Sequence, residues 1–206
     1  KNDKATDKKQ LLPVNAGQYN KILIVGDNAT RNLTQGGGSS ELKVKKVISP
    51  LDAFRKRFKD KIIYSQGYTA GENTYGEHSK ILQVTADSLR NDAVQKAKNA
   101  DIVIFIGGLN KNYQQDSEGG DRISYGLPYG QNELIDELYK VNKNVVVVIV
   151  SGNAVEMPWV DRVPSIVQSW YLGSIGGEAL ADVLTGKVTP SGKLPFSYSK
   201  KLEDCP

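Results

Sequence analysis

Four short runs of consecutive apolar residues constrain the fold of this 206-residue chain more than any other feature. Their residues do not alternate with polar ones, so each run predicts a strand buried on both faces, as in a parallel sheet covered by helices. The fourth run is rich in β-branched residues, which favour strands. The runs lie at 21–26, 61–64, 101–107 and 144–150, and a weaker fifth candidate lies at 165–170.

Amphipathic segments separate these runs. Apolar residues recur in them at helical spacing, and Gly186 follows the last segment as a helix stop. The predicted helices lie at 50–58, 86–100, 131–139 and 177–184. Alternating strands and helices predict an α/β fold, a three-layer sandwich with a mainly parallel central sheet and helices on both faces. We expect one domain at 15–200, flanked by segments at 1–14 and 201–206, and residues 1–10 predict no regular structure.

Charge and composition exclude several classes of protein. The net charge is +4, but the lysines are scattered and not interleaved with aromatic residues along one face, which disfavours nucleic-acid binding. With Cys205 and His78 as the single cysteine and histidine, neither an intrachain disulfide nor a structural zinc site is expected. No apolar segment reaches the roughly 18 residues that a membrane span needs. The sequence therefore predicts no metal, no cofactor and no membrane span.

An acidic segment at 116–122, Asp-Ser-Glu-Gly-Gly-Asp-Arg, follows the third apolar run. Open α/β sheets bind ligands at the carboxyl ends of their strands, so this loop is a candidate catalytic site, half of one, or a polar turn. Glu118 is expected on an accessible loop, where it would need a neighbouring carboxylate or an apolar lid to donate a proton near neutral pH. Asp121 and Arg122 are predicted to pair and to pin the loop.

A glycine-rich segment at 34–40 follows the first predicted strand. It lacks the Gly-Lys-Ser/Thr ending of a P-loop, and the strand end at 26–28 does not match Gly-x-Gly-x-x-Gly, so nucleotide binding is disfavoured. Two readings stay open: a mobile surface loop, or a loop whose bare backbone approaches a ligand. No Gly-x-Ser-x-Gly motif occurs, which disfavours serine hydrolase chemistry.

Three isolated side chains have structural explanations beside functional ones. His78 is expected to be an incidental surface residue. Trp159 and Trp170 lie beside predicted strand-end loops, where they pack in the core or an interface, or else offer sugar-stacking surfaces.

Taken together, the motifs resemble the second domain of family 3 glycoside hydrolases, the β-glucosidases and β-xylosidases. The resemblance covers about 185 residues in the right order. The matching segments are 11–13, 36–39, 116–122, 127–128, 131–135, 152–159, 170–184, 186 and 190–196. In that family the second domain is an α/β sandwich, and retaining hydrolysis uses two carboxylates. One is an Asp of a preceding TIM-barrel domain, and the other is commonly a Glu of the second domain.

The resemblance implies roles for particular residues. Glu118 matches the general acid/base, with Asp116 as the alternative. Gly37, Gly38 and Ser39 would line the mouth of the substrate pocket, and Asp121 and Arg122 would hold the Glu118 loop.

It also implies a partner and a substrate class. Residues 1–14 would be the end of a linker from the barrel, and 201–206 would lead towards a further C-terminal module. The substrate would be a β-linked oligosaccharide or glucoside, the chain alone would be inactive, and such enzymes are often periplasmic or secreted. Two alternatives are a non-catalytic carbohydrate-binding or interaction domain of a degenerate relative, and a flavodoxin-like small-molecule binder.

Overall fold

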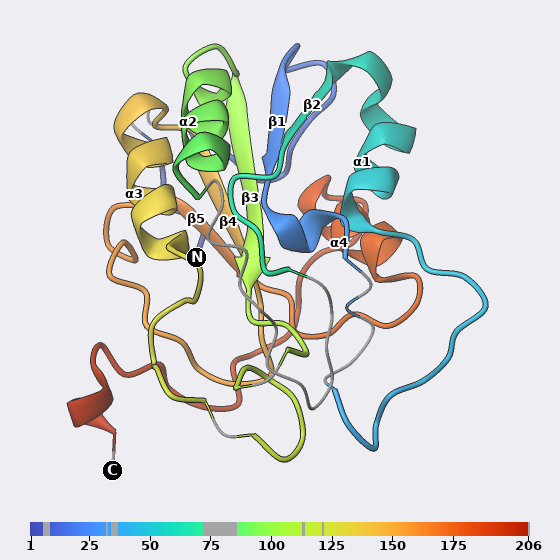
Figure 1. The fold of residues 1–206 in the computed structure, drawn as a ribbon. Coiled ribbons are helices and arrows are strands. Elements are labelled where there is room, and N and C mark those ends of the chain that lie inside the picture. Colours follow the sequence, from blue (N-terminus) through green and yellow to red (C-terminus); the bar gives the residue numbers. More distant parts are fainter. Residues whose placement is uncertain are drawn as a thin grey trace.

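The computed structural model describes residues 1–5, 9–31, 33, 37–71, 86–112, 114–120 and 122–205. Within these ranges, five parallel strands form one sheet in the order β2-β1-β3-β4-β5 (Figure 1). The strands are β1 (Ile22–Val25), β2 (Ile62–Ser65), β3 (Ile102–Gly108), β4 (Val145–Val150) and β5 (Ser165–Gln168). The predicted α/β class and the parallel sheet are therefore confirmed, and the weak fifth candidate is a strand that ends two residues early.

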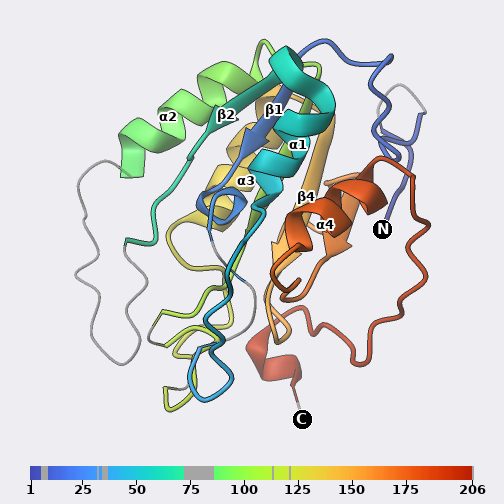
Figure 2. The same cartoon turned by 90° about the vertical axis from the view of Figure 1, so that its right-hand side faces the viewer.

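Four α-helices cover the two faces of the sheet: α1 (Pro50–Phe58), α2 (Ala86–Ala97), α3 (Gln131–Val141) and α4 (Gly176–Leu184). In Figures 1 and 2, α1 and α4 lie on one face and α2 and α3 on the other. Short 3₁₀ helices lie at Asp27–Ala29, Lys59–Lys61 and Leu202–Asp204. The four predicted helices are confirmed, with ends that differ from the predicted ones by up to three residues.

The core has two halves because successive strand residues point to opposite faces. Ile22 and Ile24 of β1 pack with α1 and α4, whereas Leu23 and Val25 pack with α2 and α3. Every residue of β3 and β4 is buried, which explains why their sequences are continuous apolar runs rather than alternating ones.

Side chains that end or anchor the helices follow ordinary capping chemistry. Ser49 caps α1, its hydroxyl accepting the backbone N–H of Asp52 at 3.1 Å, and Pro50 occupies the first helical position. The fully buried Gln131 opens α3 and exchanges two hydrogen bonds with the backbone of Gly108, at 2.7 and 2.9 Å. Gln131 thereby ties the start of α3 to the end of β3.

The N-terminal residues were predicted to lack structure, and for residues 1–5 that prediction is wrong. Asn2 forms an antiparallel bridge with Ser165 at the start of β5, and the backbone N–H of Ile166 donates to the carbonyl of Lys1 at 2.9 Å. Hydrogen-bonding groups at the free edge of a sheet favour such pairing, whatever the polarity of the added segment.

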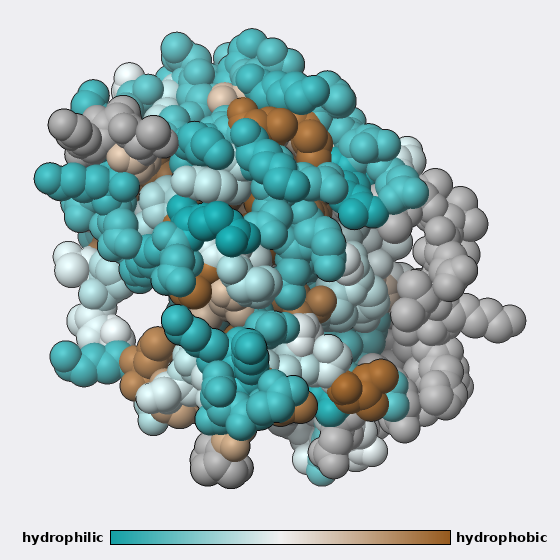
Figure 3. Space-filling view, turned by 90° about the vertical axis from the view of Figure 1, so that its left-hand side faces the viewer, coloured by the Kyte–Doolittle hydropathy of each residue, from teal (hydrophilic) through white to brown (hydrophobic). Residues whose placement is uncertain are grey.

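The helical face of the molecule and the carboxyl edge of the sheet differ in character. Figure 3 shows the side of the molecule on which α3 lies, where residues are mostly hydrophilic, as expected for the solvated face of amphipathic helices. The long loops instead gather at the carboxyl ends of the strands, at the lower side of Figure 1. None of the helices in the described ranges combines the length and apolar character that crossing a membrane requires.

Candidate functional site at the carboxyl edge of the sheet

Asp116 joins the loops that follow three neighbouring strands. Its Oδ2 accepts hydrogen bonds from the backbone N–H of Gly152 after β4, at 2.6 Å, and from the hydroxyl of Tyr171 after β5, at 2.9 Å. Its Oδ1 accepts from the side-chain amide of Asn153 at 3.3 Å. Asp116 itself follows β3, so one carboxylate connects the exits of β3, β4 and β5.

The glycine-rich loop lies directly against the acidic loop. The backbone N–H of Gly37 donates to the carbonyl of Asp116 at 3.3 Å, and the N–H of Glu118 donates to the carbonyl of Gly37 at 3.4 Å. The backbone N–H of Ser39 donates to Oε2 of Glu118. Two segments about 80 residues apart in the sequence therefore form one unit around the Glu118 carboxylate.

Gly38 is required in this unit for two reasons. Its φ of +98° belongs to a region that residues with a side chain rarely adopt. A Cβ at this position would lie 2.2 Å from Cβ of Glu118. Only glycine leaves the space that Glu118 occupies.

The Glu118 carboxylate is exposed and held in its ionised form. The backbone N–H of Ser39, and then its side chain, lower the pKa of Glu118 below its ordinary value. A carboxyl group in this state is a proton acceptor near neutral pH. To donate a proton it must lose this contact or be covered by an apolar or anionic group.

Asp116 has a different environment from Glu118. Its three donors all belong to neighbouring loops: Gly152 and Asn153 follow β4, and Tyr171 follows β5. Burial raises the pKa of the Tyr171 hydroxyl far above its ordinary value, and the Asp116 carboxylate adds to that effect, so Tyr171 stays a neutral donor. In this arrangement Asp116 holds the loops together, while Glu118 is the carboxylate that faces outward.

The other predicted site residues are distributed as follows. Arg122 donates to the backbone carbonyl of Ala154 at 2.8 Å, and its guanidinium lies 5.9 Å from the centre of the Tyr125 ring. It thus connects the acidic loop to the loop after β4. Asp121, Gly36 and His78 lie outside the described residues.

The two tryptophans differ in exposure. Trp159 is fully buried, and its indole N–H donates to Oδ1 of Asn132 at 2.9 Å. The prediction that Trp159 packs in the core is therefore confirmed, and the alternative that it offers a sugar-stacking surface is wrong. Trp170 is half-buried, and its ring packs edge-on against Phe196 with the ring centres 5.7 Å apart.

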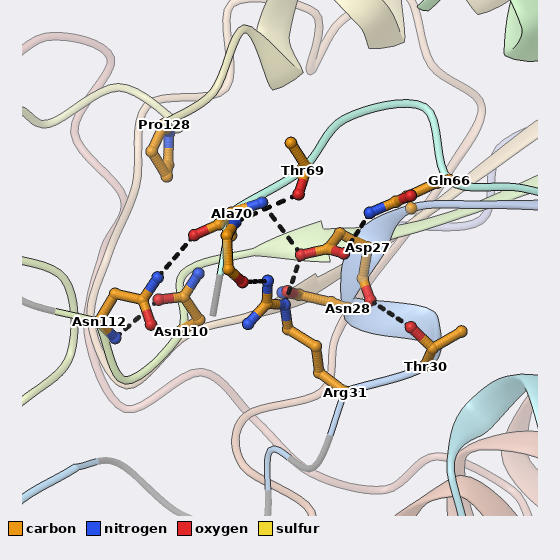
Figure 4. Close-up of polar contacts among 12 residues, drawn as sticks. Asp27, Asn28, Thr30, Arg31, Gln66, Thr69, Ala70, Asn110, Asn112 and Pro128 are labelled. Atoms are coloured by element: carbon orange, nitrogen blue, oxygen red, sulfur yellow. Dashed lines mark hydrogen bonds and ion pairs between the residues drawn. The ribbon is translucent and has the colours of Figure 1, made fainter. Parts of the chain in front are cut away.

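A second polar cluster lies at the carboxyl ends of β1, β2 and β3 (Figure 4). The buried carboxylate of Asp27 pairs with Arg31 and accepts from the side chain of Gln66 at 2.9 Å and the backbone N–H of Ala70 at 3.2 Å. The side chain of Asn112 donates to the carbonyl of Ala70 at 2.8 Å. These contacts join the exits of the three strands with the protein's own side chains.

Several of these residues carry no recognisable sequence signal. Tyr171 is one of ten tyrosines, and the pair formed by Lys111 and Glu41 links positions 70 residues apart. Asp27 directly follows the first apolar run, and this position was a usable signal for a strand-end residue.

Among the described residues, no three His, Cys, Asp or Glu side chains gather to hold a metal ion.

Comparison with known proteins shows the family to which the chain belongs. The family model described as the glycosyl hydrolase family 3 C-terminal domain matches residues 1–206. The chain is 71% identical over 203 residues to beta-glucosidase BoGH3A of Bacteroides ovatus, a match that covers 98% of this chain and 27% of that protein. It is 36% identical over 214 residues to the exo-alpha-(1->6)-L-arabinopyranosidase of Bifidobacterium longum, covering 100% of this chain and 26% of that protein.

A solved structure shows the same fold. The GH3 beta-glucosidase of Bifidobacterium adolescentis matches with a TM-score of 0.81 and 37% identity, covering all of this chain and 27% of that one. The chain thus spans about a quarter of the length of the relatives it matches. With a family model that matches its whole length, the chain belongs to the C-terminal domain family of the family 3 glycosyl hydrolases.

Proposed function

We propose that the chain is the second domain of a retaining, exo-acting β-glycosidase of the β-glucosidase type. In this proposal it supplies the general acid/base, Glu118, and part of the substrate pocket. The observation that carries the proposal is the pairing of Glu118 with the glycine-rich loop: an outward-facing carboxylate is held at the carboxyl edge of the sheet by Ser39. Gly37, Gly38 and Ser39 would line the pocket beside it.

The second carboxylate of a retaining pair would come from elsewhere in the protein. Retaining glycosidases hold their two carboxyl groups about 5–5.5 Å apart on either side of the scissile bond. Asp116 is engaged by Gly152, Asn153 and Tyr171, which suits it to holding the loops rather than to attacking a sugar. We therefore place the nucleophile, an Asp, in a TIM-barrel domain, consistent with the 27% of the Bacteroides ovatus relative that the chain spans.

The proposed reaction uses Glu118 twice. In the first step the protonated carboxyl gives its proton to the glycosidic oxygen while the barrel Asp attacks the anomeric carbon and the leaving group departs. In the second step the Glu118 carboxylate takes a proton from water, and that water oxygen displaces the Asp. The contact with Ser39 favours the ionised form needed in the second step. A bound sugar that desolvates Glu118 would favour the protonated form needed in the first.

The central experiment is Glu118→Ala in the full-length enzyme. Loss of the acid/base should slow aryl β-glucosides with poor leaving groups most, and added azide should restore turnover of activated substrates. The isolated 206-residue chain should not turn over an aryl β-glucoside. Unchanged activity in Glu118→Ala would transfer the test to Asp116→Ala, and unchanged activity in both would favour a non-catalytic carbohydrate-binding role.

A further inference from the structure

Lys111 is a buried cation with a distant partner. The residue is 9% exposed, and lysine is rarely buried to this degree unless its charge is paired. Its Nζ lies 2.5 Å from Oε1 of Glu41. Lys111 follows β3, whereas Glu41 directly follows the glycine-rich loop, so the ion pair connects the same two regions of the chain that meet at Glu118.

The stretch that follows the glycine-rich loop has no regular secondary structure. Residues 41–49 form no helix or strand, and the backbone N–H of Ile48 donates to the carbonyl of Ser174 at 2.9 Å near the end of this stretch. At the beginning of the loop, a Cβ on Gly37 would lie 3.1 Å from Cβ of Lys111 and 3.1 Å from Cβ of Ser117. The lysine stem is therefore part of the wall against which the loop packs.

The ion pair lies two residues beyond the amide that holds Glu118. Glu41 donates its own backbone N–H to the carbonyl of Gly38 at 2.9 Å, closing a turn around Ser39. A side chain fixed at Glu41 thus fixes the turn, and the turn directs the Ser39 N–H at the Glu118 carboxylate. Loss of the ion pair would leave this donor free to move away.

Other charged groups lie near Glu118. On its own loop, Asp116 is held by three donors and Arg122 donates to Ala154, while Asp121 lies outside the described residues. From the packed loops, Lys111 and Glu41 neutralise one another. The stretch after Glu41 also carries Lys43, Lys45 and Lys46.

We propose that the Lys111–Glu41 ion pair positions the catalytic carboxylate by fastening the loop whose Ser39 amide holds Glu118. Lys111 and Glu41 are positioning residues that act through this loop, and the inference rests on the proposed acid/base role of Glu118. The pair would matter most for steps in which the carboxyl must meet the leaving oxygen in a defined geometry.

The test compares Lys111→Met and Glu41→Gln in the full-length enzyme, with Lys111→Arg as the conservative variant. Lys96→Met, which removes a more exposed lysine paired with Asp92 on α2, is the control for loss of an ion pair away from the site. Because small misplacements of a catalytic group have large effects, Lys111→Met should lower kcat/KM for poor leaving groups on the order of tenfold. Good leaving groups should be nearly unaffected, Lys111→Arg should retain most activity, and Lys96→Met should behave as wild type.

The pH profile separates positioning from direct electrostatics. If the pair acts through the loop, both variants lose the Ser39 contact, and the alkaline limb of kcat/KM moves to higher pH in both. If the two charges instead act on Glu118 through space, Lys111→Met moves the alkaline limb to higher pH and Glu41→Gln moves it to lower pH. Opposite shifts, or no change in either readout, would overturn the proposal.

Two further measurements keep the result interpretable. Thermal unfolding reports whether each variant is folded, and the double variant Lys111→Met/Glu41→Gln avoids the unpaired buried cation that Glu41→Gln leaves. The double variant should match the single ones in rate, because all three release the same loop. Glu118→Ala is assayed in parallel. If Glu118→Ala retains the alkaline limb of kcat/KM, Glu118 is not the acid/base. If Glu118→Ala loses that limb but the Lys111 and Glu41 variants leave it at the wild-type pH, only the positioning role fails.

Discussion

The hydroxyl of Tyr171 donates a 2.9 Å hydrogen bond to the carboxylate of Asp116, joining the loop after β5 to the loop that carries Glu118. Burial keeps Tyr171 neutral, so this donor is present throughout the physiological pH range. The bond therefore belongs to the scaffold of the site, and its removal has consequences for stability.

Tyr171→Phe should lower the free energy of unfolding by about 1.5–3 kcal/mol, the usual range for a hydrogen bond to a charged group. Tyr125→Phe is the matched control, because the Tyr125 hydroxyl donates at 2.9 Å to a neutral acceptor, the carbonyl of Ser199. It should lose only about 0.5–1.5 kcal/mol. Urea unfolding of both variants measures the difference, and equal losses would argue against a charged acceptor at Asp116.

Gly38→Ala should displace the Glu118 side chain. The added Cβ would lie 2.2 Å from Cβ of Glu118, and the φ of +98° adds backbone strain of about 1–3 kcal/mol. Gly119→Ala separates these effects, since Gly119 also has a positive φ, +79°, but nothing lies within 4 Å of its Cβ position. Full-length enzyme should lose activity in the first variant and keep it in the second, and equal activities would place the steric contact outside the catalytic site.

Ser39→Ala should move the alkaline limb of kcat/KM to higher pH. The Ser39 side chain contributes to the lowered pKa of Glu118, so its removal raises the pKa at which the acid form is lost. Ser117→Ala is the control, because its hydroxyl donates to the carbonyl of Asn112 at 3.3 Å instead of Glu118. A profile that shifts equally in both variants would point to a general change in the loop.

Asp101 should contribute to stability at neutral pH but not in strong acid. The backbone N–H groups of Asn20 and Lys21, at 2.7 and 2.9 Å, hold its pKa below the ordinary value. A depressed folded-state pKa adds stability above the unfolded-state pKa of about 3.9, and that stability is lost as the pH falls through the lower folded value. Urea midpoints from about pH 6 down to pH 2 should show a shallower acid loss in Asp101→Asn than in wild type. Asp60→Asn, at an exposed carboxylate in the 3₁₀ helix after α1, is measured beside it as the control for removing one negative charge.

Asp27→Ala should be strongly destabilising. It removes the carboxylate from a buried pair with Arg31, whose side chain is 10% exposed, and leaves a largely buried guanidinium. Breaking such a pair from one side costs roughly 3–5 kcal/mol. Replacing both residues, in Asp27→Leu/Arg31→Met, should cost less than the single change, and urea unfolding of the two proteins decides whether the buried charge is the cause.

Much of the architecture could be read from local sequence. The valine run of β4 and the isoleucine-rich run of β3 are buried on both faces, and an apolar run between helices has few other ways to satisfy its backbone and its side chains. The acidic loop was predictable as a strand-end loop for the same reason, and Glu118 as its accessible carboxylate. The structure of the N-terminal segment was not predictable from local sequence, because the segment pairs with a free sheet edge, β5, that lies over 160 residues away in the chain.

What the sequence by itself determined is the order of strands and helices, the family, and a carboxylate at the carboxyl edge of the sheet. Only the tertiary structure decided that Gly38 and Ser39 hold Glu118, that Asp116 is engaged by three loop donors, and that Lys111 pairs with Glu41. The physical reason is the distance along the chain over which each effect acts. Periodicity and propensity act over a few neighbouring residues, whereas the protonation state and direction of a carboxyl group depend on donors brought together from separate strand ends.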